Sequence, residues 1–208
     1  MTLFDCHTHH PSRDGERVFQ QDVDNYGIHP WTITNENIDS LLVEFDKRII
    51  DNMFISIGEC GLDRLCNAPY EQQIKAFRHQ IIKSEELRLP LILHCVKAID
   101  DVLLIKHEMK VKQPWIIYGF RGKPQQLRQL ISHNFYFSFG FQYNIESLKA
   151  CPLDKLLLET DDINEPVSIL YNKVAKELNM PFEKLVEIIA LNVQCVFNYK
   201  WKYFESTL

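Results

Sequence analysis

The stretch FDCHTHHPSRDG, residues 4–15, decides between two α/β folds. Its beginning continues an apolar run and predicts a β-strand, whereas the proline and glycine that follow predict a turn. Side chains alternate along a strand, so His7 and His9 project from the same face. An open dinucleotide-binding sheet needs a glycine-rich turn after its first strand, and this turn lacks the GxGxxG spacing. The stretch therefore favours a closed (β/α)8 barrel over an open doubly wound sheet.

The rest of the chain alternates two patterns. Short apolar runs of strand length lie at residues 2–6, 53–58, 90–95, 115–119, 135–140 and 155–159. Helical patterns with one apolar face lie at residues 38–49, 74–82 and 167–178. Four prolines stand where helices are expected to begin: Pro69, Pro124, Pro166 and Pro181. Strands that alternate with helices predict βα units and a parallel sheet.

Composition sets the outer limits. The 208 residues are 46% hydrophobic and 25% charged, which predicts one globular domain over residues 1–208. The net charge of -5 gives no overall attraction to nucleic acid or membrane, so any phosphate binding must be local. Six cysteines without a CxxC pair indicate reduced thiols. No apolar run reaches the ~18 residues of a membrane helix, and the histidines come too early for a signal peptide, so the expected location is the cytoplasm.

Polar side chains stand at the ends of several apolar runs. They are Glu59 in FISIGECGLD, His94 in PLILHC, Tyr118 and Arg121 in WIIYGFRG, and Glu159 and Asp161 in LLLETDD. In a barrel the carboxyl ends of the strands surround one mouth, where residues distant in sequence converge. Imidazoles and carboxylates together suit one or two divalent cations, and such cations activate water for hydrolysis. The sequence therefore predicts a metal-dependent hydrolase.

Eight motifs carry a resemblance to a known family. In chain order they are DCHTHH, YGIHPW, IGECGLD, RLPLILHC, YGFRG, YFSFG, LLLETD and NEP. This order resembles the TatD family of metal-dependent hydrolases, within the amidohydrolase superfamily, from Phe4 to about Phe197. The resemblance implies a (β/α)8-type barrel and a metal-dependent deoxyribonuclease or phosphodiesterase.

The resemblance also implies roles for individual residues. His7, His9 and Asp161 would hold one metal, Glu59 would be shared with a second metal, and His94 would belong to that second metal. Asp161, with Glu59 as the other catalytic carboxylate, would take a proton from the attacking water. His29 would contact substrate, and Asp63 would orient a neighbour. The resemblance implies one or two ions and leaves Zn, Mg, Mn, Ni and Co open.

One departure from the family concerns Tyr118. The family usually has a histidine at the start of this motif, and a phenol with a pKa near 10 is a poor replacement ligand. The second metal site is therefore expected to be weak, filled only with substrate, or absent. His10 could replace the missing imidazole, although a surface role is the alternative.

Four cations closely follow expected strands: Arg64, Lys97, Arg121 and Lys123. The first three are assigned with His29 and Tyr118 to substrate binding. Arginine and lysine can clamp phosphate oxygens there, and the alternative is that they are solvated loop charges.

A second departure concerns length. Only 19 residues separate His9 from His29, too few for a normal helix and a complete strand. We expect the first crossover helix, and with it strand two, to be deleted, and residues 17–26 to supply a rudimentary strand. The result would be a barrel of seven to eight strands, distorted near strands one and two, with a mouth more open on that side.

The leading hypothesis is a cytoplasmic hydrolase of phosphodiesters, with DNA as the expected substrate. The alternatives are hydrolysis of another bond (amide, lactone or ester) and a catalytically impaired metal-binding homologue. No membrane and no obligatory protein partner are expected. The tail, residues 199–208, is expected to pack against the outer helices.

Overall fold

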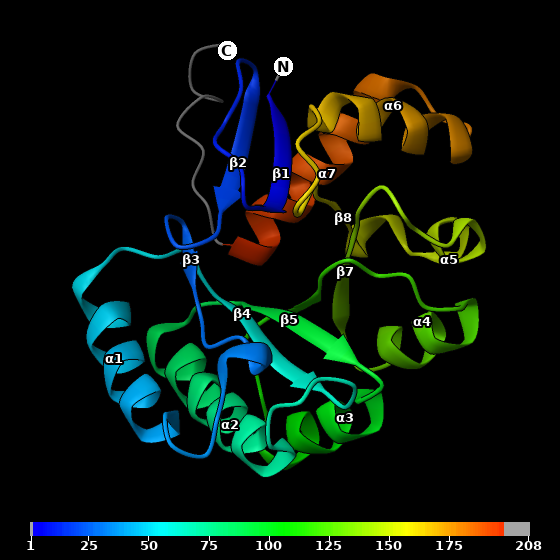
Figure 1. The fold of residues 1–208 in the computed structure, drawn as a ribbon. Coiled ribbons are helices and arrows are strands. Elements are labelled where there is room, and N and C mark those ends of the chain that lie inside the picture. The colour runs from blue at the N-terminus through cyan, green and yellow to red at the C-terminus, as the bar shows by residue number, and fades with distance from the viewer. Residues whose placement is uncertain (1, 198–208) are drawn as a thin grey trace.

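The computed structural model describes residues 2–197, and it contains eight parallel strands in chain order (Figure 1). The strands are β1 Leu3–Thr8, β2 Glu16–Gln20, β3 Asn25–Tyr26, β4 Ser56–Asp63, β5 Leu91–Val96, β6 Trp115–Ile117, β7 Phe135–Phe139 and β8 Leu156–Leu158. The helices are α1 Ile38–Asp51, α2 Tyr70–Leu87, α3 Ile99–Glu108, α4 Pro124–Ile131, α5 Ile145–Ala150, α6 Val167–Glu177 and α7 Phe182–Phe197. Two short 3-10 helices, η1 Pro30–Thr32 and η2 Leu153–Lys155, complete the elements.

The strands close into a ring. β1 pairs with β2, and β3 to β8 form a second run of parallel neighbours. Single bridges, Gln21 with Asn25 and Thr8 with Asp161, join the two runs at both edges. At the second seam the Asp161 amide donates to the His7 carbonyl at 3.0 Å, and the His9 amide donates to the Asp161 carbonyl at 3.2 Å. The predicted barrel is confirmed.

The shortened region differs from its prediction in one respect. No helix lies between β1 and β2 in the described chain, so the loss of the first crossover helix is confirmed. The expected loss of strand two is wrong, because β2 pairs with β1 from Leu3 opposite Glu16 onward. Gly15, at φ +80°, reverses the chain, and its carbonyl accepts from the Leu3 amide at 3.0 Å. The expected rudimentary strand is thus two short strands, β2 and β3.

The strands are apolar because helices cover them on the outside and other strands face them within. All eight residues of β4 are buried, and the buried apolar side chains form one continuous cluster. Helices α2, α4, α6 and α7 begin at or just after the four prolines, as predicted. β4 extends to Asp63, beyond the predicted end at residue 58, so Glu59 lies within the strand and not at its end.

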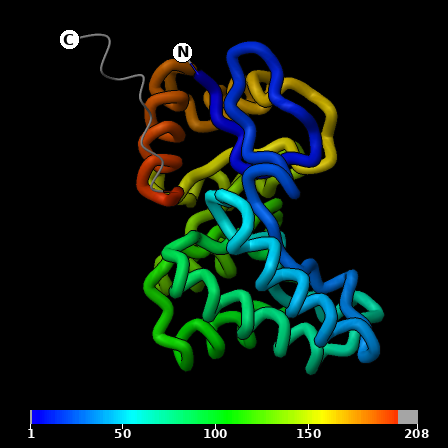
Figure 2. Tube along the Cα trace, turned by 90° about the vertical axis from the view of Figure 1, so that its left-hand side faces the viewer, coloured from blue at the N-terminus to red at the C-terminus, as the bar shows by residue number. Residues whose placement is uncertain are grey.

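The two ends of the described chain pack together. Figures 1 and 2 show β1 and β2 beside α6 and α7. The Tyr171 hydroxyl of α6 donates to the Phe4 carbonyl at 2.9 Å and accepts from the Phe4 amide at 3.2 Å. In residues 2–197, none of the helices combines the length and apolar character needed to cross a membrane. The tail, residues 199–208, lies outside the described residues.

Candidate metal centre

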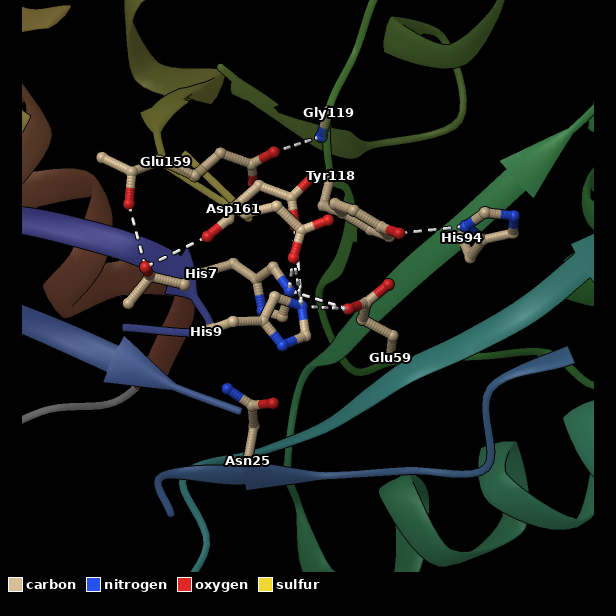
Figure 3. A network of polar contacts seen from close by, with 12 residues as sticks. His7, His9, Asn25, Glu59, His94, Tyr118, Gly119, Glu159 and Asp161 are labelled. Atoms are coloured by element: carbon tan, nitrogen blue, oxygen red, sulfur yellow. Dashed lines mark hydrogen bonds and ion pairs between the residues drawn. The ribbon is translucent and has the colours of Figure 1, made fainter. Parts of the chain in front are cut away.

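Four side chains converge at the carboxyl-terminal mouth of the barrel (Figure 3). His7 Nε2 lies 2.9 Å from Glu59 Oε1, and His9 Nε2 lies 3.2 Å from the same oxygen. Asp161 Oδ1 is 3.9 Å from His7 Nε2 and 3.7 Å from His9 Nε2. These four side chains, called the first cluster, offer two imidazole nitrogens and two carboxylate oxygens, a donor set that fits a divalent cation.

The backbone places the first cluster at the seam of the barrel. His7 and His9 lie on the same face of β1 and its continuation, as the alternation of side chains predicts. Asp161 adopts a left-handed conformation at φ +56° just after β8. The Thr8 hydroxyl donates to the Asp161 carbonyl at 3.2 Å, which fixes this turn against β1.

Burial and charge act against each other in the first cluster. Burial favours the neutral imidazole of His7, but the hydrogen bond and charge of Glu59 outweigh it and raise the pKa of His7 to about 9. Burial also opposes ionisation of Glu59, yet its hydrogen bonds to His7 and His9 lower the pKa of Glu59 far below its ordinary value. Burial raises the pKa of Asp161, and the charge of His7 offsets part of this rise. A cation bound there would replace the imidazole proton as the partner of both carboxylates.

A second group of donors, the second cluster, shares Glu59 with the first. It consists of His29, Glu59 and His94. His29 Nε2 lies 3.5 Å from Glu59 Oε2, and the rings of His29 and His94 have centroids 4.5 Å apart. Burial lowers the pKa of His29 to about 4, so this imidazole is neutral at pH 7.

His94 is held from two sides. Its Nε2 lies 2.9 Å from Asp63 Oδ2, and its Nδ1 lies 3.0 Å from the Tyr118 hydroxyl. Figure 3 shows the Tyr118 side chain reaching across the mouth toward His94. Asp63 therefore orients a neighbour, the role that the sequence predicts for it.

Both clusters open into one cavity of about 850 Å³. It extends past Gln21, Tyr26 and Leu41, on the side where the first crossover helix is missing. Trp31 stands at its edge with 65% of its surface exposed, and its indole N–H donates to Asp63 Oδ2 at 2.7 Å.

The predicted site residues fall into two sets. The first set lies in the two clusters or lines the cavity, and it consists of His7, His9, His29, Glu59, His94, Tyr118, Arg121 and Asp161.

Arg64 and Lys97 do not join them. Arg64 donates to Asp101 Oδ2 at 3.0 and 2.6 Å and lies over the Tyr70 ring, while Lys97 is exposed outside the cavity lining. Their assignment to substrate binding has no support from their positions. His10 belongs to neither cluster, and its Nε2 contacts the Asp162 carbonyl at 3.0 Å.

Two residues of the site were not assigned a role from the sequence. Trp31 follows the GIHP motif, but its exposure and its bond to Asp63 depend on the turn of η1. Glu159 is fully buried and accepts from the Gly119 amide at 2.5 Å. Its place at the end of a predicted strand was the available signal, because buried carboxylates need a partner.

The comparison with known families decides the assignment. The model of the TatD-related DNase family matches residues 17–198. The chain belongs to this family. The matched range begins after His7 and His9. Of the first cluster, Glu59 and Asp161 therefore lie inside the matched range, and the two histidines lie before it.

Individual TatD-family proteins are similar to this chain. A metal-dependent hydrolase of Bacillus subtilis, YabD, is 32% identical over 69% of this chain and 65% of its own length. The deoxyribonuclease Tat-D of Schizosaccharomyces pombe is 34% identical over 65% of this chain, which spans 49% of that protein. The crystal structure of YjjV, a TatD homologue from Escherichia coli, matches 90% of this chain and 78% of its own with a TM-score of 0.70 at 18% identity. The chain thus spans about half to two thirds of the length of these two curated relatives.

Proposed function

We propose that this chain is a divalent-metal-dependent hydrolase that cleaves phosphodiesters by attack of an activated water. The observation that carries the proposal is the first cluster, in which two imidazoles and two carboxylates face a common space. When bound, a divalent cation lowers the pKa of water and polarises the substrate oxygen.

The residues of the chain would divide the remaining work. His7 and His9 would bind the cation through Nε2, with Glu59 and Asp161 completing the set. Asp161, whose side chain is 25% exposed, would accept the proton of the attacking water. Arg121 lines the same cavity and would pair with a phosphate oxygen.

The charge of the cavity supports a central role for the cation. Its lining includes five carboxylates, from Asp22, Glu44, Glu59, Asp161 and Asp162. Arg121 is the only lysine or arginine among the described lining residues. A phosphodiester would be repelled from this cavity unless bound cations offset the negative charge. We therefore propose that the cation contributes to substrate binding as well as to water activation.

DNA is the substrate that we propose. The fission-yeast relative bears the name deoxyribonuclease, and the exposed indole of Trp31 offers a surface on which an unpaired base can stack. All six cysteines lie among the described residues and are free, which supports our proposal of a reducing, cytoplasmic location. No membrane and no obligatory protein partner are part of this proposal.

An Asp161→Asn substitution tests the proposed function. We expect the metal-loaded protein to cleave labelled single-stranded DNA and bis(p-nitrophenyl) phosphate. The substitution should lower kcat on both by roughly 100-fold to 10,000-fold, because a neutral amide cannot accept the proton. Circular dichroism would verify folding, and steady-state kinetics would measure the loss.

Asp154→Asn, at an exposed position in η2, is the matched control and should retain full activity. Absence of cleavage of either phosphodiester, or equal activity of the Asp161→Asn variant, would overturn the proposal. Cleavage of amides, lactones or carboxyl esters in place of phosphodiesters would support the other hydrolase hypothesis.

A further inference from the structure

We infer that the Tyr118 hydroxyl closes the second cluster, so that the centre retains one resident divalent cation in the first cluster. The inference rests on the metal centre of the proposed function and adds the number of ions and the residue that limits it. Its basis is the hydrogen bonding of His94, whose two ring nitrogens are both engaged.

His94 Nε2 faces the Asp63 carboxylate. Asp63 Oδ2 accepts from the Trp31 indole at 2.7 Å and lies 2.9 Å from His94 Nε2, while Asp63 Oδ1 accepts from the Leu65 amide at 2.7 Å. The Asp63 carboxylate accepts hydrogen bonds from these groups and has no proton to donate, so His94 Nε2 must be the donor toward it. Nε2 therefore carries the ring proton. His94 Nδ1 is then the only ring nitrogen with a lone pair for a cation.

The Tyr118 hydroxyl occupies that lone pair. The Tyr118 hydroxyl lies 3.0 Å from His94 Nδ1 and, since Nδ1 has no proton, donates to it. The same hydroxyl also faces the Glu59 carboxylate of the second cluster, so His94 Nδ1 and Glu59 share its single proton. A cation there would have to displace the phenol from His94.

Tyr118 is held in place by ring contacts and by its backbone. Its ring lies between those of His7 and His94, with centroid distances of 5.1 and 5.9 Å. Its amide donates to the Leu93 carbonyl at 3.3 Å, and the next amide, of Gly119, donates to buried Glu159 at 2.5 Å. Displacing the hydroxyl therefore means disturbing a packed ring and its backbone.

The first cluster has no such obstacle. His7 Nε2 and His9 Nε2 both face Glu59 Oε1, which is itself a candidate metal ligand, and within residues 2–197 no hydroxyl from outside the cluster is hydrogen-bonded to either nitrogen. Removing the Tyr118 hydroxyl would leave His29, Glu59 and His94 as a complete three-donor group. Tyr118→Phe frees His94 Nδ1, and Tyr118→His also adds an imidazole.

Equilibrium dialysis of the full chain against Mn²⁺ tests the inference, with metal content and electron paramagnetic resonance as readouts. We expect one Mn²⁺ per wild-type chain with an uncoupled spectrum. Tyr118→His should bind a second ion more than roughly tenfold tighter than wild type, and its spectrum should show spin coupling between two ions. Tyr118→Phe should show the same change to a smaller extent.

Tyr70→Phe is the matched control, because the Tyr70 hydroxyl bonds to Asp101 outside the cavity lining, and it should bind one ion. Two tightly bound, spin-coupled ions in the wild type would overturn the inference and leave the proposed function intact. A single ion in both folded Tyr118 variants would also overturn it. No bound Mn²⁺ in the wild type would overturn the metal centre and the inference together.

Discussion

Glu59 is the residue that joins the two clusters, because its two carboxylate oxygens face different imidazoles. Oε1 lies near His7 and His9, whereas Oε2 lies 3.5 Å from His29 Nε2. The Glu59 carboxylate is buried, so its negative charge needs positively charged partners. In the metal-free protein these partners are protonated imidazoles, and in the metal-bound protein the partner would be the cation. The protonation of His7 is consequently linked to metal binding.

The raised pKa of His7 predicts proton release on metal binding. Without metal its pKa is about 9, because the bond and charge of Glu59 outweigh burial, so His7 is protonated at neutral pH. A cation requires neutral rings, so binding near pH 7 should release the His7 proton together with any proton held by His9, whose pKa Glu59 also raises, and none above about pH 10. Metal affinity should accordingly rise with pH up to about 9. Isothermal titration calorimetry in buffers of different ionisation enthalpy would measure the release, and a heat independent of buffer would contradict the assignment.

Sequence patterns predicted where regular strands place the candidate site residues. His7 and His9 follow from the alternation of β1, and Glu59 and His94 follow from their places in parallel strands. The roles of residues on irregular segments were harder to predict, because the directions of their side chains depend on tertiary contacts. Arg64 turns to Asp101, and Trp31 turns to Asp63.

At the scale of elements, β4 carries Glu59 and Asp63 because its glycines let neighbouring strands approach closely. A Cβ on Gly61 would lie 2.2 Å from the His94 carbonyl oxygen, and φ there is +130°. The sequence pattern predicted that this strand ends at residue 58, because glycine usually weakens a strand. Its continuation depends on pairing with β5 through Gly61 opposite His94, which no local pattern contains.

Gly61→Ala should therefore destabilise the protein and disturb the second cluster. The backbone strain and the clash with β5 together should cost roughly 2 to 4 kcal/mol of unfolding free energy. Gly15→Ala is the matched control, because φ is +80° there but nothing lies within 4 Å of the added Cβ, so about 1 kcal/mol is expected. Urea denaturation would compare the two variants, and equal losses would show that close packing on β5 does not limit this position.

At the scale of the whole molecule, the first cluster spans a seam of the barrel. His7 lies on the amino-terminal strand and His9 directly after it, Asp161 follows the last strand, and Glu59 lies on the fourth. The alternation of strands and helices in the sequence predicted the barrel, but it did not predict that β2 is present. That strand is short, and only Val18 and Phe19 are buried in it, too few for a clear periodic pattern.

The central claim is that the first cluster holds a divalent cation across this seam. Anomalous diffraction from crystals of the full chain grown with Mn²⁺, recorded near the metal's absorption edge, tests it most directly. We predict a strong peak bounded by His7 Nε2, His9 Nε2, Glu59 and Asp161. A map with no peak among these four side chains, or with its strongest peak elsewhere, would contradict the claim.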